Sequence, residues 1–101
     1  MVKLAGFDWD AGNRQKCRKH GVSLAEIEEV FRGAPAVFPD PTHSQRERRM
    51  RAIGPTQRGH YVFVAFTLRT DAVGHTRIRP ISARYMHAKE IRHYVRQQEE
   101  S

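Results

Sequence analysis

Arginine is the residue type that carries most of the chemistry in this sequence. Of the 101 residues, 14 are arginine, 4 are lysine and 11 are acidic, which gives a formal net charge of +7. The guanidinium group is planar, stays charged and offers a fork of donors that matches a phosphate. The composition therefore predicts a phosphate-bearing or acidic partner, either a nucleic acid or an acidic protein segment. The alternative is that the charge only maintains solubility.

The arginines in the last third of the sequence have the spacing of a phosphate-binding surface. Arg77 and Arg79 are two residues apart, so they share a face if this segment is a strand. Arg84 follows where that strand is expected to end. Such cations could stabilise negative charge on a reacting phosphate, and we predict a catalytic role for Arg79 and Arg84. A solvated strand face is the alternative.

A second basic cluster surrounds one acidic residue near the middle of the sequence. Glu47 lies among Arg46, Arg48, Arg49 and Arg51. A carboxylate among cations stays ionised, so Glu47 could act as a general base. The alternative is an ordinary ion pair between neighbouring strands.

Two further side chains could transfer protons. His20 is the best single candidate, because the charge of an imidazole changes near neutral pH. Lys19 and Gly21 flank it at an expected helix end, so capping of the last carbonyl groups is the alternative. Tyr94 could donate a proton, although a tyrosine at helical spacing is also typical of a core.

The other histidines and the single cysteine give no pattern of metal ligands. No two histidines lie four residues apart, and no cluster of carboxylates accompanies them, so we predict no metal site and no cofactor. Cys17 cannot form an internal disulfide, and we interpret it as a small buried hydrophobic residue. The histidines in question are His43, His60, His75, His87 and His93.

Local signals predict three helices. Asp10 is a plausible N-cap for a helix over 11–20, and Gly21 follows its end. Ser23 and Glu26 form a capping box at the start of the second helix, which Gly33 ends. A third helix is expected over roughly 87–98.

Strand signals occupy the rest of the sequence. Residues 60–69 are rich in β-branched and aromatic residues and contain no turn former, so we expect a central strand covered on both faces, with Phe63 and Phe66 in the core. Pro80 predicts an edge position or a bulge in its strand. The other expected strands cover residues 2–9, 36–38, 46–54 and 76–83.

Together these elements predict an α+β fold of the order β-αα-ββββ-α. A helical hairpin and a C-terminal helix would pack on an antiparallel sheet of four to five strands. The length fits one domain, residues 1–101. The first residues lack the apolar run of a signal peptide, and no segment is apolar enough for a membrane helix, so a cytoplasmic location is expected.

The order of several short motifs resembles the BrnT family of toxins from type II toxin–antitoxin systems. The resemblance extends from about residue 7 to residue 94, and its most specific parts are the Lys-His-Gly and Ile-Ser-Ala-Arg segments. The matching residues are Phe7, Trp9, Asp10, Lys19 to Val22, Glu26, Glu47, Arg48, Gly54, Thr67, Arg69, Arg77 to Arg84, Glu90 and Tyr94.

This resemblance implies a RelE-like ribonuclease fold, metal-independent cleavage of RNA and inhibition of translation. It also implies a BrnA-like antitoxin with a ribbon-helix-helix domain, which neutralises the toxin and alone contacts operator DNA. On this reading His20, Glu47, Arg79 and Arg84 are catalytic. The residues expected to bind RNA are Lys19, Arg48, Arg49, Arg51, Arg77 and Tyr94.

A non-catalytic role is the alternative function. The chain would then keep the basic surface, bind RNA or the antitoxin without turnover, and act mainly as the co-repressor partner of the DNA-binding antitoxin. Cleavage of RNA by the isolated chain discriminates between the two.

Overall fold

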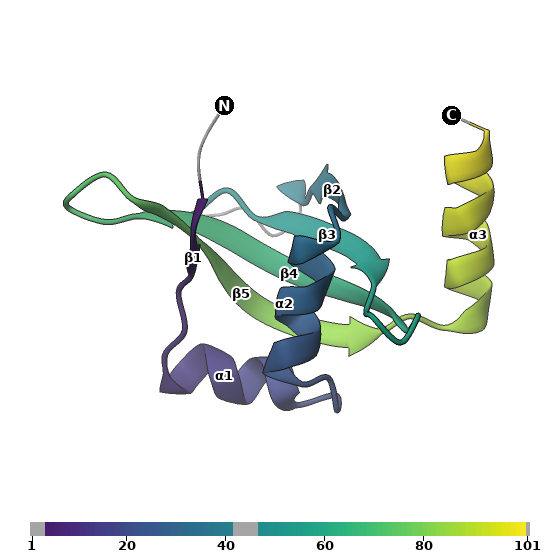
Figure 1. Ribbon diagram of the computed structural model, residues 1–101, viewed down its shortest axis with the longest axis horizontal. Helices are drawn as coiled ribbons and strands as arrows, with labels where there is room; N and C mark the ends of the chain where they lie inside the picture. The colour runs from purple at the N-terminus through teal and green to yellow at the C-terminus, as the bar shows by residue number, and fades with distance from the viewer. Residues whose placement is uncertain (1–3, 42–46, 101) are drawn as a thin grey trace.

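The computed structural model describes residues 4–41 and 47–100, and it confirms the predicted order of elements (Figure 1). Three helices and a five-stranded sheet give the expected α+β class. The elements are β1 (Leu4–Phe7), α1 (Ala11–Arg18), α2 (Leu24–Arg32), β2 (Ala36–Pro39), β3 (Met50–Pro55), β4 (Tyr61–Thr70), β5 (Thr76–Tyr85) and α3 (Ala88–Glu99).

The sheet has the strand order β1-β5-β4-β3-β2, so β4 is central as predicted. Strands β2 to β5 pair antiparallel through consecutive neighbours. The first strand instead pairs parallel with β5, which corrects the expectation of a purely antiparallel sheet. A parallel pair needs a long crossover, and here all the intervening elements supply it.

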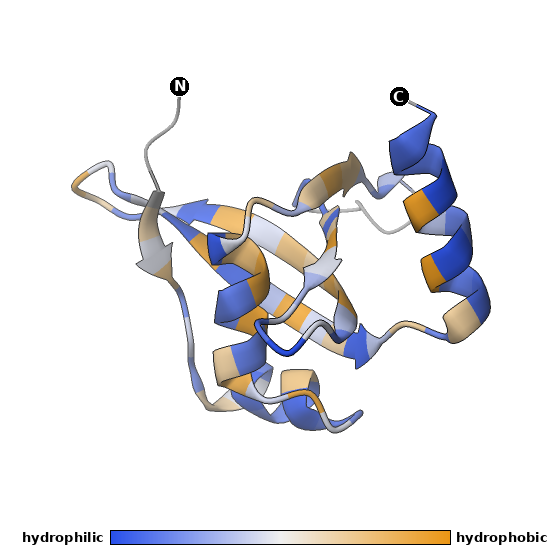
Figure 2. Cartoon of the chain, turned by 45° about the vertical axis from the view of Figure 1, so that its right-hand side comes forward, coloured by the Kyte–Doolittle hydropathy of each residue, from blue (hydrophilic) through white to orange (hydrophobic). Residues whose placement is uncertain are grey.

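The core lies between the sheet and the helices α1 and α2. Ile27 and Val30 of α2 pack with Val62, Val64 and Phe66 of β4 in one buried cluster. Hydrophobic and hydrophilic residues alternate in the first half of β5, where Ile78 lies between two arginines (Figure 2). Since side chains of a strand point alternately to its two faces, the intervening residues lie on the opposite face of the sheet.

A capping side chain fixes the start of each of the helices α1 and α2. Asp10 caps α1 in a reciprocal box with Asn13, and Ser23 caps α2 with Glu26. Helix α1 ends at Arg18, two residues earlier than predicted, because Lys19 already serves as its C-cap. Gly21 then turns the chain with a φ of +87°, a conformation that favours glycine.

Pro80 lies at an irregularity of β5, as the sequence predicted. The register passes from Ala65 opposite Ser82 to Phe66 opposite Pro80, so β5 carries one extra residue there. The strand is not an edge strand. Beyond Ile78, α1 replaces β1 beside it, and the Asn13 amide donates to the Pro80 carbonyl at 2.9 Å.

The arginine-rich strand begins later than predicted. β3 starts at Met50, and the described residues Glu47, Arg48 and Arg49 precede it as irregular chain. The Asp40 N–H donates to the Arg49 carbonyl, which closes the connection from β2 at this point. Arg46, which the prediction included, lies outside the described residues.

Helix α3 stands apart from the other two helices (Figure 1). None of its residues is buried, and Ile91 and Val95, four residues apart on one side of the helix, are only partly covered. It is attached through side chains of β4 and β5. No helix in the described part of the chain is long and apolar enough to cross a bilayer.

The substitution Asn13→Ala tests the junction of α1 with the sheet. Asn13 is 4% exposed, and its amide bonds the carbonyl groups of Asp8 and Pro80. Its removal leaves buried acceptors unsatisfied, so the free energy of unfolding in urea should fall by about 1–3 kcal/mol. The exposed neighbour Gln15→Ala is the matched control and should change it by less than about 0.5 kcal/mol. Equal effects would contradict this role of Asn13.

Candidate functional site

The register of three strands brings five arginines to one face of the sheet. We call the face that α1 and α2 leave uncovered the open face. Arg69 pairs with Arg77, and Thr67 with Arg79. These positions alternate with the buried residues Phe66 and Ile78, so they point to the open face. By the same alternation the arginines of the open face are Arg51, Arg69, Arg77, Arg79 and Arg84.

Arg69 and Arg77 face each other directly across β4 and β5, which would be destabilising for two like charges. Each has a carboxylate partner. Arg69 binds Glu47 at 2.7 Å, and Arg77 binds Asp71 at 3.1 Å. Backbone N–H groups of His75 and Val73, and then Arg77, lower the pKa of Asp71, so it stays ionised.

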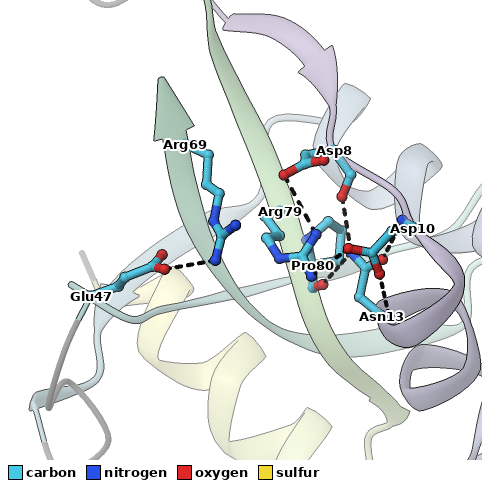
Figure 3. Close-up of polar contacts among 7 residues, drawn as sticks. All are labelled: Asp8, Asp10, Asn13, Glu47, Arg69, Arg79 and Pro80. Carbon is cyan, nitrogen blue, oxygen red and sulfur yellow. Dashed lines mark hydrogen bonds and ion pairs between the residues drawn. The ribbon is translucent and has the colours of Figure 1, made fainter. Parts of the chain in front are cut away.

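Arg79 turns from the open face toward the edge where β1 ends (Figure 3). Its two terminal nitrogens bind Asp8 at 3.5 Å and Asp10 at 2.8 Å. The Asn13 N–H, and then Arg79, lower the pKa of Asp10. Arg79 therefore joins the sheet to the start of α1, and its guanidinium is the most enclosed of these ion-paired arginines, with 18% of its side chain exposed.

Arg84 joins the sheet to α3 by a bidentate ion pair. Both terminal nitrogens bind the Glu90 carboxylate, at 2.8 and 2.9 Å, and the guanidinium lies 4.9 Å from the centre of the Phe63 ring. The bidentate pair lowers the pKa of Glu90 to about 2 and raises that of Arg84. Phe63 is thus a cation–π platform on the open face rather than the core residue that we predicted.

A cavity of about 460 Å³ separates this part of the open face from α3. That volume is within the range of about 300–1,000 Å³ typical of small-ligand sites. Cations, rings and proton-transfer groups come together in its lining. The lining residues with chemical potential are Arg51, Phe63, Arg84, Glu90, His93 and Tyr94.

Two predicted RNA-binding residues, Arg51 and Tyr94, line this cavity. Arg51 donates to the Pro39 carbonyl at 3.3 Å, while its buried Nε–H finds no acceptor within the described chain. Tyr94 packs edge-on against Tyr61, and burial raises the pKa of its hydroxyl. The phenol therefore stays protonated at neutral pH and can donate a hydrogen bond.

Other predicted site residues lie away from the cavity. His20 and Lys19 are exposed at the end of α1, in the helical layer, where the Tyr85 hydroxyl lies 3.5 Å from the Gly21 carbonyl. Arg48 is exposed before β3, and Arg49 lies 4.0 Å from Asp40. The structure therefore groups Arg51, Arg84 and Tyr94 around the cavity but does not bring His20 to them.

Sequence reasoning missed His93 and Arg69 as candidates. His93 lies three residues after Glu90 on α3, a spacing that places both on one side of the helix. Arg69 is opposite Arg77, which only the register of β4 and β5 reveals. When the strand pairing is unknown, neither position can be distinguished from an ordinary exposed residue.

Cys17 is enclosed in the core, and the described residues contain no group of candidate metal ligands. Cys17 is fully buried, as predicted, and burial raises its pKa to about 11, so the thiol stays protonated. No group of three His, Cys, Asp or Glu side chains among residues 4–41 and 47–100 is placed to hold a metal ion.

Fold and site define a small α+β domain with an arginine-lined face suited to a phosphate chain. The chain belongs to the BrnT family: the model described as "Ribonuclease toxin, BrnT, of type II toxin-antitoxin system" matches residues 9–90. Membership implies an RNA substrate and an antitoxin partner, and it confirms the resemblance seen in the sequence. The chain has no match among curated proteins.

The Arg84–Glu90 pair gives the attachment of α3 a defined pH dependence. The pKa of Glu90 is lowered from 4.5 to about 2 in the folded protein. The ion pair therefore stabilises the attachment of α3 fully above pH 4.5, and this stabilisation is lost as the pH falls through 2. Glu90→Gln keeps an acceptor for the helix cap and removes the charge. Because both side chains are more than a third exposed, the pair contributes at most about 1 kcal/mol.

The measurement is the protection of α3 amides from hydrogen exchange. Above pH 4.5, Glu90→Gln should lower this protection by up to about fivefold, equivalent to about 1 kcal/mol. The difference should disappear toward pH 2. Glu99→Gln, on the same helix, should have no effect. A difference that persists unchanged at pH 2 would contradict the assigned pair.

Proposed function

We propose that the chain is a metal-independent endoribonuclease toxin that binds RNA on the open face. The observation that supports this most strongly is the register that lines one face with five arginines, next to a cavity that also holds His93 and Tyr94. Guanidinium groups in a row suit a chain of phosphates, and the adjacent cavity suits one nucleotide. Family membership supplies the substrate class.

Metal-free cleavage of RNA needs three contributions. The 2′-hydroxyl attacks the neighbouring phosphorus, so a base must accept its proton and an acid must protonate the leaving 5′-oxygen. Cations must stabilise the charge that develops on the phosphoryl oxygens. Arg84 and Arg51 would take the cationic role, and Tyr94 would be the acid, because all three line the same cavity. Arg79 is more enclosed and is bound by Asp8 and Asp10. It would therefore act mainly by holding β5 to the start of α1.

Aromatic rings along the same face favour single-stranded RNA. Tyr94 lines the cavity and Phe63 lies beneath Arg84. Sequence-independent recognition of unpaired RNA combines a positive groove with rings on which bases stack. Arg69 and Arg77 would exchange their carboxylate partners for phosphates as RNA enters.

The antitoxin would neutralise the toxin by covering the same surface. We propose a BrnA-like partner that inserts an acidic segment along the open face, because a negative peptide satisfies the arginines as RNA does. Its ribbon-helix-helix domain would provide the contacts to operator DNA. Such a pair would act where mRNA is translated, in the cytoplasm.

RNA cleavage in the presence of EDTA tests the proposal. The purified wild-type chain should cut single-stranded RNA with EDTA present. Arg84→Ala should lower kcat at least tenfold, because one donor to the developing charge is lost. Arg84→Lys should restore the rate only in part, since lysine lacks the bidentate fork. Arg14→Ala, an exposed arginine of α1, is the charge-matched control and should leave kcat unchanged.

Binding of intact RNA without any cleavage by the wild-type chain would overturn the proposal and favour the non-catalytic alternative. Loss of activity in EDTA that Mg²⁺ restores would refute metal independence alone.

His20→Ala is a separate test of the role predicted from the sequence. If His20 transfers a proton, kcat should fall about 10²-fold or more while the fold stays stable. A rate within twofold of the wild-type rate would remove His20 from the mechanism and leave the open face as the site.

A further inference from the structure

Helix α3 presents one stripe of side chains to the cavity. Glu90, His93, Tyr94 and Gln97 all line it, and their spacing of three, four and seven residues places them on one side of the helix. Two contacts fix this side against the sheet: the Glu90 pair with Arg84, and the packing of Tyr94 against the Tyr61 ring. His93 lies between these two anchors. The family match ends at residue 90, so it assigns no role to His93.

We propose that His93 is the group that accepts the proton of the 2′-hydroxyl during RNA cleavage. This inference rests on the proposed function, in which no residue of the cavity has yet been assigned as the base. The neutral imidazole takes the hydroxyl proton as the 2′-oxygen bonds to phosphorus. The bond from phosphorus to the 5′-oxygen breaks, and that oxygen takes the proton of Tyr94. The products are a 2′,3′-cyclic phosphate and a 5′-hydroxyl end, and solvent then returns a proton from His93 to Tyr94.

Residues near His93 could supply the two other contributions to cleavage, the cations that stabilise the phosphoryl charge and the acid that protonates the 5′-oxygen. The charged and titratable residues that face it across the cavity are Arg51 of β3 and Arg84 of β5, with Glu90 and Tyr94 on its own helix. The two guanidinium groups can hold the phosphate, while Glu90 already binds Arg84. Histidine is the side chain whose ordinary change of charge falls between about pH 5 and 8, so it can accept a proton at neutral pH.

Glu47, the base predicted from the sequence, lies far from His93 and from the cavity. Glu47 binds Arg69, which lies opposite Arg77. Arg77 and Arg84 are seven residues apart on β5, which corresponds to roughly 20 Å along a strand. A base beside Arg77 cannot reach a phosphate held at Arg84. His93 therefore completes the arginine pair at the cavity, and Glu47 belongs to the other end of the open face.

The test compares His93→Gln with the wild type in single-turnover cleavage of a short single-stranded RNA. His93→Gln should lower the rate at least 10²-fold and change the RNA Kd less than threefold, because a proton acceptor acts in the reaction and not in binding. The acid limb of the wild-type pH–rate profile should disappear. Added imidazole should restore part of the rate to His93→Ala. Gln98→Ala, exposed on the same helix and outside the cavity, is the control.

The possible failures are distinguishable. A His93→Gln variant that cleaves at the wild-type rate with an unchanged pH profile would overturn the role of His93, whereas loss of cleavage in Arg84→Ala would still support the proposed function. A wild-type chain that binds RNA and never cleaves it would overturn both. A tenfold weaker Kd with an unchanged rate at saturation would show that His93 only binds RNA.

Discussion

The alternation of side chains along β3, β4 and β5 is the constraint on which the rest of the structure depends. One set of positions carries Ala52, Val64 and Phe66 into the core beneath α2. The other set carries the arginines to the open face. A shift of one residue in register would exchange the two faces and bury guanidinium groups. The hydrophobic core therefore also fixes the direction in which the arginines point.

Five cations on one face repel one another, and the structure offsets this with carboxylates from other segments. Asp8 and Asp10 come from the chain after β1, Asp71 from the turn after β4, and Glu90 from α3. Most of these pairs are partly exposed, so each contributes little to stability and can be exchanged. The same carboxylates thus reduce the repulsion among the arginines through ion pairs that a phosphate could replace.

Helix α3 completes the site with little packing of its own. No residue of α3 is buried, and its stripe of Glu90, His93 and Tyr94 meets the sheet through an ion pair and a ring contact. A ligand that binds Arg84 would compete with Glu90, but it leaves the contact between the Tyr94 and Tyr61 rings in place to hold α3 at the sheet. On the proposed function, entry of RNA or of the antitoxin would break one exchangeable ion pair and leave the core folded.

Local rules predicted the elements well, because caps, turn residues and hydrophobic period are properties of neighbouring residues. Ser23 with Glu26, and Pro80 at its bulge, behaved as their chemistry requires. The site was harder to predict because it is assembled by pairing. Phe63 was expected in the core, since its strand is hydrophobic throughout and only the register assigns its face.

His93 was overlooked for a related reason: the sequence contains no signal that α3 returns to the open face. The Arg84–Glu90 pair that brings it there joins a strand to the following helix and becomes visible only in the fold.

The most direct test of the central claim is an amide chemical-shift map of the chain with a 2′-O-methyl RNA, which binds but cannot be cleaved. The account predicts that the shifted amides cluster on β3, β4, β5 and the cavity side of α3, with broadening strongest around Arg51, Arg84 and His93. Shifts confined to α1 and α2, with the open face unaffected, would contradict it.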